Sequence, residues 1–217
     1  YTRTFNNMNL YVFLLCFLPL SLFSQGEVVK YFDNGNIKYK GNFKEGKPDG
    51  IFKYYYSDGK IKSSLEYFNE GYSAACRHYH KNGIVSAVGL YSDKSKDSTW
   101  IYYDNKGNIL LKEEYNEGVL NGSVVTYYES GQRLQIENYV LGEKEGVFKK
   151  FYNTGELEIN CIYNENKNNG EYTRYYKNGK IDTKGIYVEG LKHGIWEYFD
   201  QDGLLLQKIE YNHGYEK

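Results

Sequence analysis

The sequence predicts an all-β fold, in which about seven to eight 24-residue repeats form an elongated, single-sheet antiparallel β-meander resembling a solenoid. Three observations predict it. Glycine recurs every 24 residues without an insertion, aromatic residues hold fixed positions between these glycines, and Tyr supplies 26 of the 217 residues while Pro supplies two. Aromatic and β-branched residues favour strands. The repeat glycines are Gly35, Gly59, Gly83, Gly107, Gly131, Gly155, Gly179 and Gly203.

Two turns divide each cycle into two strands. The repeat glycine usually follows Asn or Asp, as in Asn178-Gly179, and this dipeptide predicts a two-residue hairpin whose central residues both have positive φ. A second pair of glycines, such as Gly190 and Gly194, lies 11 and 15 residues after the repeat glycine and predicts the other turn. Helix is disfavoured because glycine would interrupt it too often. We therefore expect about 16 short strands between residues 27 and 211.

Aromatic residues mark positions 8 and 20 of the cycle, counted from the repeat glycine, and position 17 is apolar or aromatic. Rings that recur in every cycle are expected to form ladders across the sheet, burying ring area while the Tyr hydroxyls stay in water. Positions 17 and 20 have opposite parity, so either both faces carry rings or a β-bulge turns one of them. The ring positions include Tyr55, Trp100, Tyr103, Tyr175, Tyr187 and Trp196.

The N-terminal region differs from the repeats. Residues 10–23 form a nearly unbroken apolar run, too short for a membrane-spanning helix, and small residues follow it. We expect residues 1–26 to be a leader and secretory signal peptide and residues 27–217 to be the repeat domain. The alternative is an uncleaved anchor. A cleaved signal predicts export to the periplasm, the outer surface or the medium.

Composition disfavours several classes of function. The net charge of −1 disfavours a nucleic-acid binder, and the sequence contains no contiguous cluster of four or more Lys and Arg, so only weak contact with membrane lipid is expected. No phosphate-binding loop, nucleophile elbow or zinc-protease motif occurs. We therefore expect a protein that is not an enzyme and binds no cofactor.

One short motif could bind a metal. Strand alternation would place Cys76, His78 and His80 on one face, as the beginning of a zinc site. No fourth ligand is evident, and Cys76 occupies position 17, where other cycles carry core residues. The favoured interpretation is a structural role, and no metal is expected.

The repeat resembles the MORN repeat superfamily, in the bacterial variant labelled YwqK-type antitoxin. Residues 175–181 match the Tyr-Tyr-x-Asn-Gly-x-Ile part of its pattern, and Tyr187, Gly190, Gly194 and Trp196 match the rest. Two cycles depart, with Glu70 and Ala74, then Lys94 and Ser98, in place of the paired glycines, so different turn geometry is expected between residues 70 and 98. The resemblance implies a non-catalytic interaction scaffold, whereas a secretory signal fits poorly with neutralising a cytoplasmic toxin.

The sequence therefore favours an exported scaffold that binds a protein partner of unknown identity. A carbohydrate- or cell-wall-binding module with exposed rings is the alternative, and an enzyme is the least favoured class. A linear sheet also leaves two edge strands, residues 27–32 and 204–211, whose unpaired backbone groups could support self-association.

We predict that the signal peptide is cleaved within residues 23–26, because the apolar run ends there in small residues. Intact-mass measurement of protein recovered from the cell envelope tests this. A mass that retains residues 10–23 would contradict it.

Overall fold

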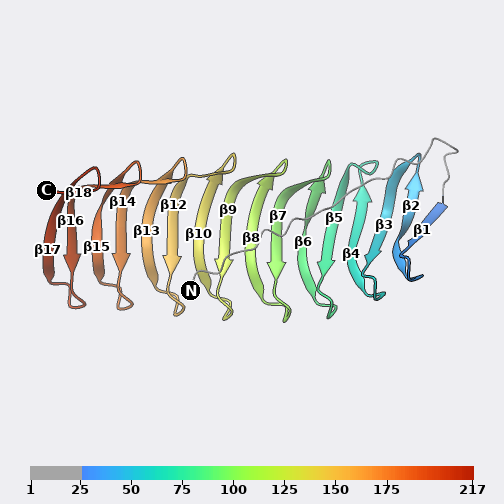
Figure 1. Ribbon diagram of the computed structural model, residues 1–217, viewed down its shortest axis with the longest axis horizontal. Helices are drawn as coiled ribbons and strands as arrows, with labels where there is room; N and C mark the ends of the chain where they lie inside the picture. Colours follow the sequence, from blue (N-terminus) through green and yellow to red (C-terminus); the bar gives the residue numbers. More distant parts are fainter. Residues whose placement is uncertain (1–25) are drawn as a thin grey trace.

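The computed structural model describes residues 26–217, so the predicted leader lies outside the described residues except for Gly26. The expected all-β meander is confirmed: the strands stand side by side in one open antiparallel sheet (Figure 1). No helix that could span a membrane occurs in the described part of the chain. The strands are β1 (Gly26–Tyr31), β2 (Ile37–Lys44), β3 (Lys47–Tyr55), β4 (Ile61–Phe68), β5 (Ser73–Tyr79), β6 (Val85–Ser92), β7 (Ser95–Tyr103), β8 (Ile109–Asn116), β9 (Val119–Tyr127), β10 (Arg133–Val140), β11 (Glu143–Lys144), β12 (Gly146–Phe151), β13 (Leu157–Asn164), β14 (Lys167–Tyr175), β15 (Ile181–Val188), β16 (Leu191–Phe199), β17 (Leu205–Asn212) and β18 (Tyr215–Glu216).

The described residues form 18 strands, two more than the sequence indicates. One strand is divided at Glu145 into β11 and β12, both of which pair with β10. The second addition is β18, which folds back onto β17 beyond the last repeat. Apart from this division, each strand is bonded to its neighbours in sequence, as in the pairs β14–β15, β15–β16 and β16–β17.

The turn at the repeat glycine is a three-residue loop. Gly179 has φ +80°, and Asn178 is not among the described residues with positive φ, so the expectation of two positive φ values here is wrong. The Gly179 amide donates to the Tyr176 carbonyl at 2.9 Å, and the Tyr176 amide donates to the Lys180 carbonyl at 2.9 Å. This is a type I turn followed by a left-handed glycine. The Asn178 side chain instead accepts the Lys180 amide at 3.0 Å.

The two-residue hairpin lies at the other end of the cycle. Glu189 and Gly190 have φ +50° and +83° between the paired residues Val188 and Leu191, which is the type I′ conformation. The second glycine of the pair, Gly194, was also expected in this turn, but it lies within β16. Its φ of +69° supports a β-bulge, in which residues 194–196 oppose the single residue between Lys184 and Ile186 on β15.

The two cycles without paired glycines differ from each other. Ser98 takes a φ of +57°, and the bulge between β6 and β7 is kept. Ala74 does not take a positive φ, and β4 pairs with β5 in an unbroken register. In this cycle the bulge is absent, and the turn widens to residues 69–72 around Gly71. The expected change in geometry therefore occurs in the first of these cycles.

Side chains in the turns join each cycle to the next. The Tyr152 hydroxyl donates to the Tyr175 carbonyl at 2.6 Å, and the Tyr176 hydroxyl donates to the Phe199 carbonyl at 2.7 Å. The Asn178 amide group donates to the Gln201 carbonyl at 2.8 Å. Each bond spans 23 residues, so the turns at the repeat glycines form a hydrogen-bonded column along the lower rim in Figure 1.

The two outer strands differ in how they are covered. Within residues 26–217, β1 pairs with β2 alone. β17 was expected to present an open edge, but β18 covers one end of it through the pairs Tyr211–Glu216 and Asn212–Tyr215. The open part of this edge is therefore shorter than the sequence indicated.

We expect Gly179→Val to lower the free energy of unfolding by at least about 1 kcal/mol, because a β-branched residue is strained at positive φ. Nothing lies within 4 Å of the Cβ position, so backbone strain is the sole cause. Denaturant melts measure the effect. Gly179→Asn is the control, because Asn tolerates this conformation, and equal midpoints for the three proteins would contradict the turn assignment.

Candidate interaction faces of the sheet

The residues at position 17 share one face of the sheet, which we call the tryptophan face. Phe52, Trp100 and Trp196 on this face are only 2%, 1% and 1% exposed, although a single sheet has no second layer to cover them. Each ring lies flat across a glycine at position 6 of its own cycle. A Cβ on Gly185 would overlap the Trp196 ring, and Gly89 has the same relation to Trp100. These glycines allow the sheet to bury rings against its own backbone.

The β-bulge also satisfies the polar group of each indole. Trp196 Nε1 donates to the Ile186 carbonyl at 3.2 Å, and Trp100 Nε1 donates to the Leu90 carbonyl at 3.0 Å. Both carbonyls lie directly after the glycine that the ring covers, at the point where the register shifts. The buried ring therefore leaves no unpaired indole N–H, which would be costly.

Lysine side chains close the tryptophan face above these rings. Lys192 Nζ lies 4.4 Å from the ring centroid of Trp196 and 4.9 Å from that of Tyr211. Lys96 lies 5.1 Å from the Trp100 ring. Burial lowers the pKa of the Lys96 ammonium, and Glu113 at 3.7 Å opposes that shift. Because these cations already lie over the Trp100 and Trp196 rings, little room is left for another ligand to stack on them.

The aromatic positions named from the sequence divide between the two faces. Tyr187 packs edge-on against Trp196, with ring centroids 4.9 Å apart, on the tryptophan face. Position 20 has the opposite parity, so its rings point to the other face of the sheet. Tyr127 is a position-20 residue, and Lys112 Nζ lies 5.9 Å from the centroid of its ring on that face. Both faces therefore carry rings, which settles the parity question. The rings named from the sequence that lie on this opposite face are Tyr55, Tyr103 and Tyr175.

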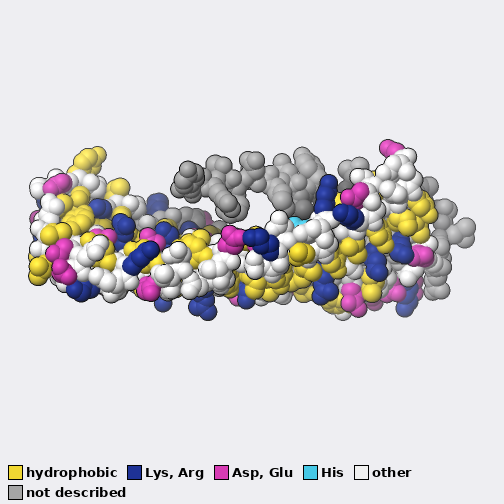
Figure 2. Space-filling model, turned by 90° about the horizontal axis from the view of Figure 1, so that it is seen from below, with side chains coloured by type: hydrophobic (Ala, Val, Ile, Leu, Met, Phe, Trp, Pro, Cys, Tyr) yellow, Lys and Arg dark blue, Asp and Glu magenta, His cyan; other side chains and the backbone are white. Residues whose placement is uncertain are grey.

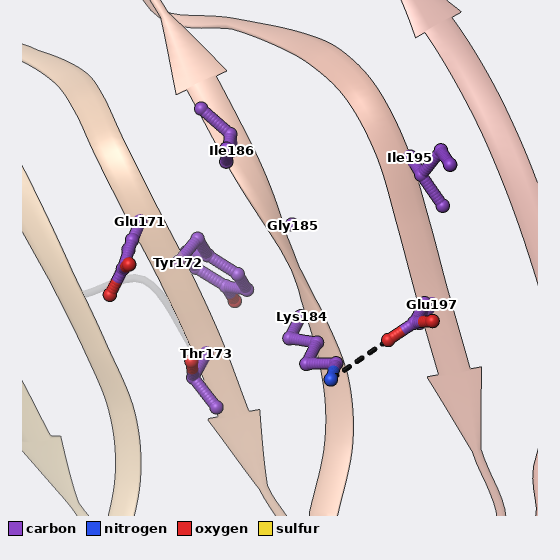
Figure 3. A pocket seen from close by; sticks show the side chains of 8 residues that line it. All are labelled: Glu171, Tyr172, Thr173, Lys184, Gly185, Ile186, Ile195 and Glu197. Carbon is purple, nitrogen blue, oxygen red and sulfur yellow. Dashed lines mark ion pairs between the residues drawn. The ribbon is translucent and has the colours of Figure 1, made fainter.

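The opposite face carries a shallow hollow over β14, β15 and β16 (Figure 3). Ile186 and Ile195 line it with 48% and 59% exposure. The Glu197 carboxylate forms ion pairs with Lys184 at 2.8 Å and with Lys208 at 2.6 Å. Hydrogen bonds to these two lysines lower the pKa of the Glu197 carboxyl, which keeps it ionised and poorly suited to proton transfer. The hollow thus combines apolar contact area with a fixed ion-pair network.

The three metal-ligand candidates are only partly brought together. Cys76 Sγ lies 3.0 Å from His78 Nε2, whereas the His80 ring bonds to the Tyr103 carbonyl at 3.0 Å. Burial raises the pKa of the Cys76 thiol to about 12 and lowers the pKa of His78, so both are neutral at pH 7. No group of three His, Cys, Asp or Glu side chains that could hold a metal occurs among residues 26–217. Cys76 packs in the core beside Trp100.

Six segments of the chain match the family model described as MORN repeat variant, and together they span more than half of its length. This agrees with the resemblance seen in the sequence. No match is found among curated proteins. Residues 70–119, which include Ala74, lie between matched segments, yet the meander continues through them. The matched segments are residues 24–45, 48–69, 120–140, 144–165, 168–189 and 192–213.

We expect Gly185→Ala to displace the Trp196 ring and to lower the free energy of unfolding by about 1–3 kcal/mol, as overpacking does. In a Trp100→Phe background, where Trp196 is the only indole, its fluorescence should shift to longer wavelength as the ring meets water. Glu171→Ala, an exposed change on the neighbouring strand, is the control. Unchanged emission and an unchanged melting midpoint in Gly185→Ala would refute the ring-over-glycine packing.

Proposed function

The chain belongs to the MORN repeat variant family, and on this premise we propose that it is an exported, non-catalytic repeat scaffold that binds a protein partner. The observation that carries the proposal is the burial of the largest rings. Trp100 and Trp196 are 1% exposed and are covered by lysines, so they serve packing rather than ligand stacking. Cell-wall-binding modules need open rings.

Exposed apolar residues on the opposite face support a protein partner. Val147 pairs with Ile162 across β12 and β13, and the two side chains are 44% and 39% exposed. Ile186 and Ile195 add further apolar surface two strands away. Aliphatic side chains of this kind gain stability by burial against another protein and offer little to a hydrated sugar.

A carbohydrate- or cell-wall-binding module is the alternative. It would use the most exposed tyrosines, Tyr31, Tyr72 and Tyr215, which are 61%, 62% and 80% exposed. These residues lie on β1, in the β4–β5 turn and on β18. Because they are dispersed along the molecule, they do not form a common stacking platform, and the scaffold is favoured.

Site-specific photo-crosslinking separates the two functions. A benzophenone side chain at Ile195 in the full chain, irradiated in its own cell envelope, should give a discrete adduct that protease digestion removes. The same group at Tyr72, which is similarly exposed in a turn, is the control and should give none. A protease-resistant adduct, together with sedimentation of the full chain on purified cell-wall polysaccharide, would replace the scaffold with the glycan-binding alternative.

A further inference from the structure

A single line of directly paired residues crosses the opposite face from β1 to β17. Directly paired residues of neighbouring strands point to the same side of a sheet. Lys40 pairs with Lys53, Ser64 pairs with Arg77, and the sequence of pairs continues strand by strand to Glu197 and Lys208. We call this line the cation ladder. Its members are Val29, Lys40, Lys53, Ser64, Arg77, Val88, Ile101, Lys112, Val125, Ile136, Lys149, Asn160, Thr173, Lys184, Glu197 and Lys208.

We propose that the cation ladder binds an extended polypeptide segment with alternating acidic and apolar side chains, laid along the molecule across the strands. This inference rests on the proposed function and specifies the chemistry of the partner. The ladder carries seven basic residues and one acidic residue, although the whole chain has a net charge of −1. This line is therefore far more basic than the composition indicates.

Most of these cations are available to a partner. Among residues 26–217, no carboxylate lies within ion-pair distance of Lys40, Lys53, Arg77, Lys112 or Lys149. Only at the β15–β17 end does Glu197 neutralise Lys184 and Lys208. An acidic partner would thus gain ion pairs along most of the sheet without breaking existing ones. The view in Figure 2 is toward the lower rim of Figure 1, and there too Lys and Arg side chains lie among hydrophobic side chains toward the β1 end.

The spacing of the cations suits an extended chain. Lys40, Arg77, Lys112, Lys149 and Lys184 follow one another at every third rung of the ladder. Three rungs at about 4.8 Å give roughly 14 Å. Four residues of an extended peptide at about 3.4 Å each also span roughly 14 Å, and side chains four residues apart point the same way. An acidic residue at every fourth position would meet every one of these cations.

The rungs between the cations favour a polypeptide over other anionic polymers. Val88 and Ile101 separate Arg77 from Lys112. Val125 and Ile136 separate Lys112 from Lys149 in the same way. Each aliphatic pair can contact an apolar side chain of the bound peptide that lies midway between two of its acidic side chains. A nucleic acid or an acidic polysaccharide carries no such groups, so it would leave the aliphatic rungs without a complement.

Fluorescence anisotropy with a defined probe tests the proposal. The probe is a labelled 20-residue peptide of repeated Glu-Ser-Val-Ser units, and its control is a shuffled peptide of the same composition. Against the full chain, the repeated peptide should bind at least about fivefold more tightly than the shuffled one. Lys112→Glu with Lys149→Glu should weaken binding by at least about tenfold, because each reversed charge faces an acidic side chain.

The matched control is the double variant Lys60→Glu with Lys94→Glu. It changes the net charge by the same amount, but both residues lie in turns between strands and outside the cation ladder. It should change affinity by less than about twofold, and thermal melts should show that both double variants remain folded. Equal weakening by the two variants, or no preference for the repeated peptide, would overturn the proposal. Tighter binding of a sulfated polysaccharide or a single-stranded oligonucleotide would assign the ladder to that polymer instead. A protein adduct at Ile195 alongside any of these outcomes would leave the scaffold function standing.

Discussion

The structure depends on one constraint, which is that a single sheet must bury its large side chains without a second layer. Trp100 and Trp196 meet it by lying flat on their own strands, over Gly89 and Gly185. A Trp side chain that buries roughly 200 Å² contributes on the order of 5 kcal/mol as an upper figure. The glycines, the bulges and the covering lysines all follow from this packing, because each one lets a ring lie close to the backbone or keeps water from it.

Because contacts run between neighbouring strands, the molecule behaves as a linear array. The cycle containing Ala74 illustrates this property. It loses its bulge and gains a longer turn, yet the strands on either side keep the same kind of pairing. Local departures are absorbed within one hairpin. Surfaces, in contrast, are built across cycles, and the cation ladder emerges only when strands from several cycles are placed side by side.

The sequence predicted the period, the strands and the meander because glycine punctuates every cycle. It assigned the two-residue hairpin to the wrong turn, since Asn178-Gly179 has the composition of that hairpin while Glu189-Gly190 adopts it. Gly89 and Gly185 were overlooked because glycine occupies position 6 in only some cycles, and only the ring above explains it. Lys112 and Lys149 could not be placed in one line before the register was known, because their spacing differs from the 24-residue period.

Hydrogen exchange, followed strand by strand in Trp100→Leu, tests most directly whether each ring stabilises only its own part of the array. Loss of this ring should remove protection from β5, β6, β7 and β8, whose residues surround it, and should leave β14 to β17 as protected as in the unaltered chain. A uniform loss of protection along the whole sheet would contradict the account, because it would mean that the sheet is stabilised as one cooperative body rather than ring by ring.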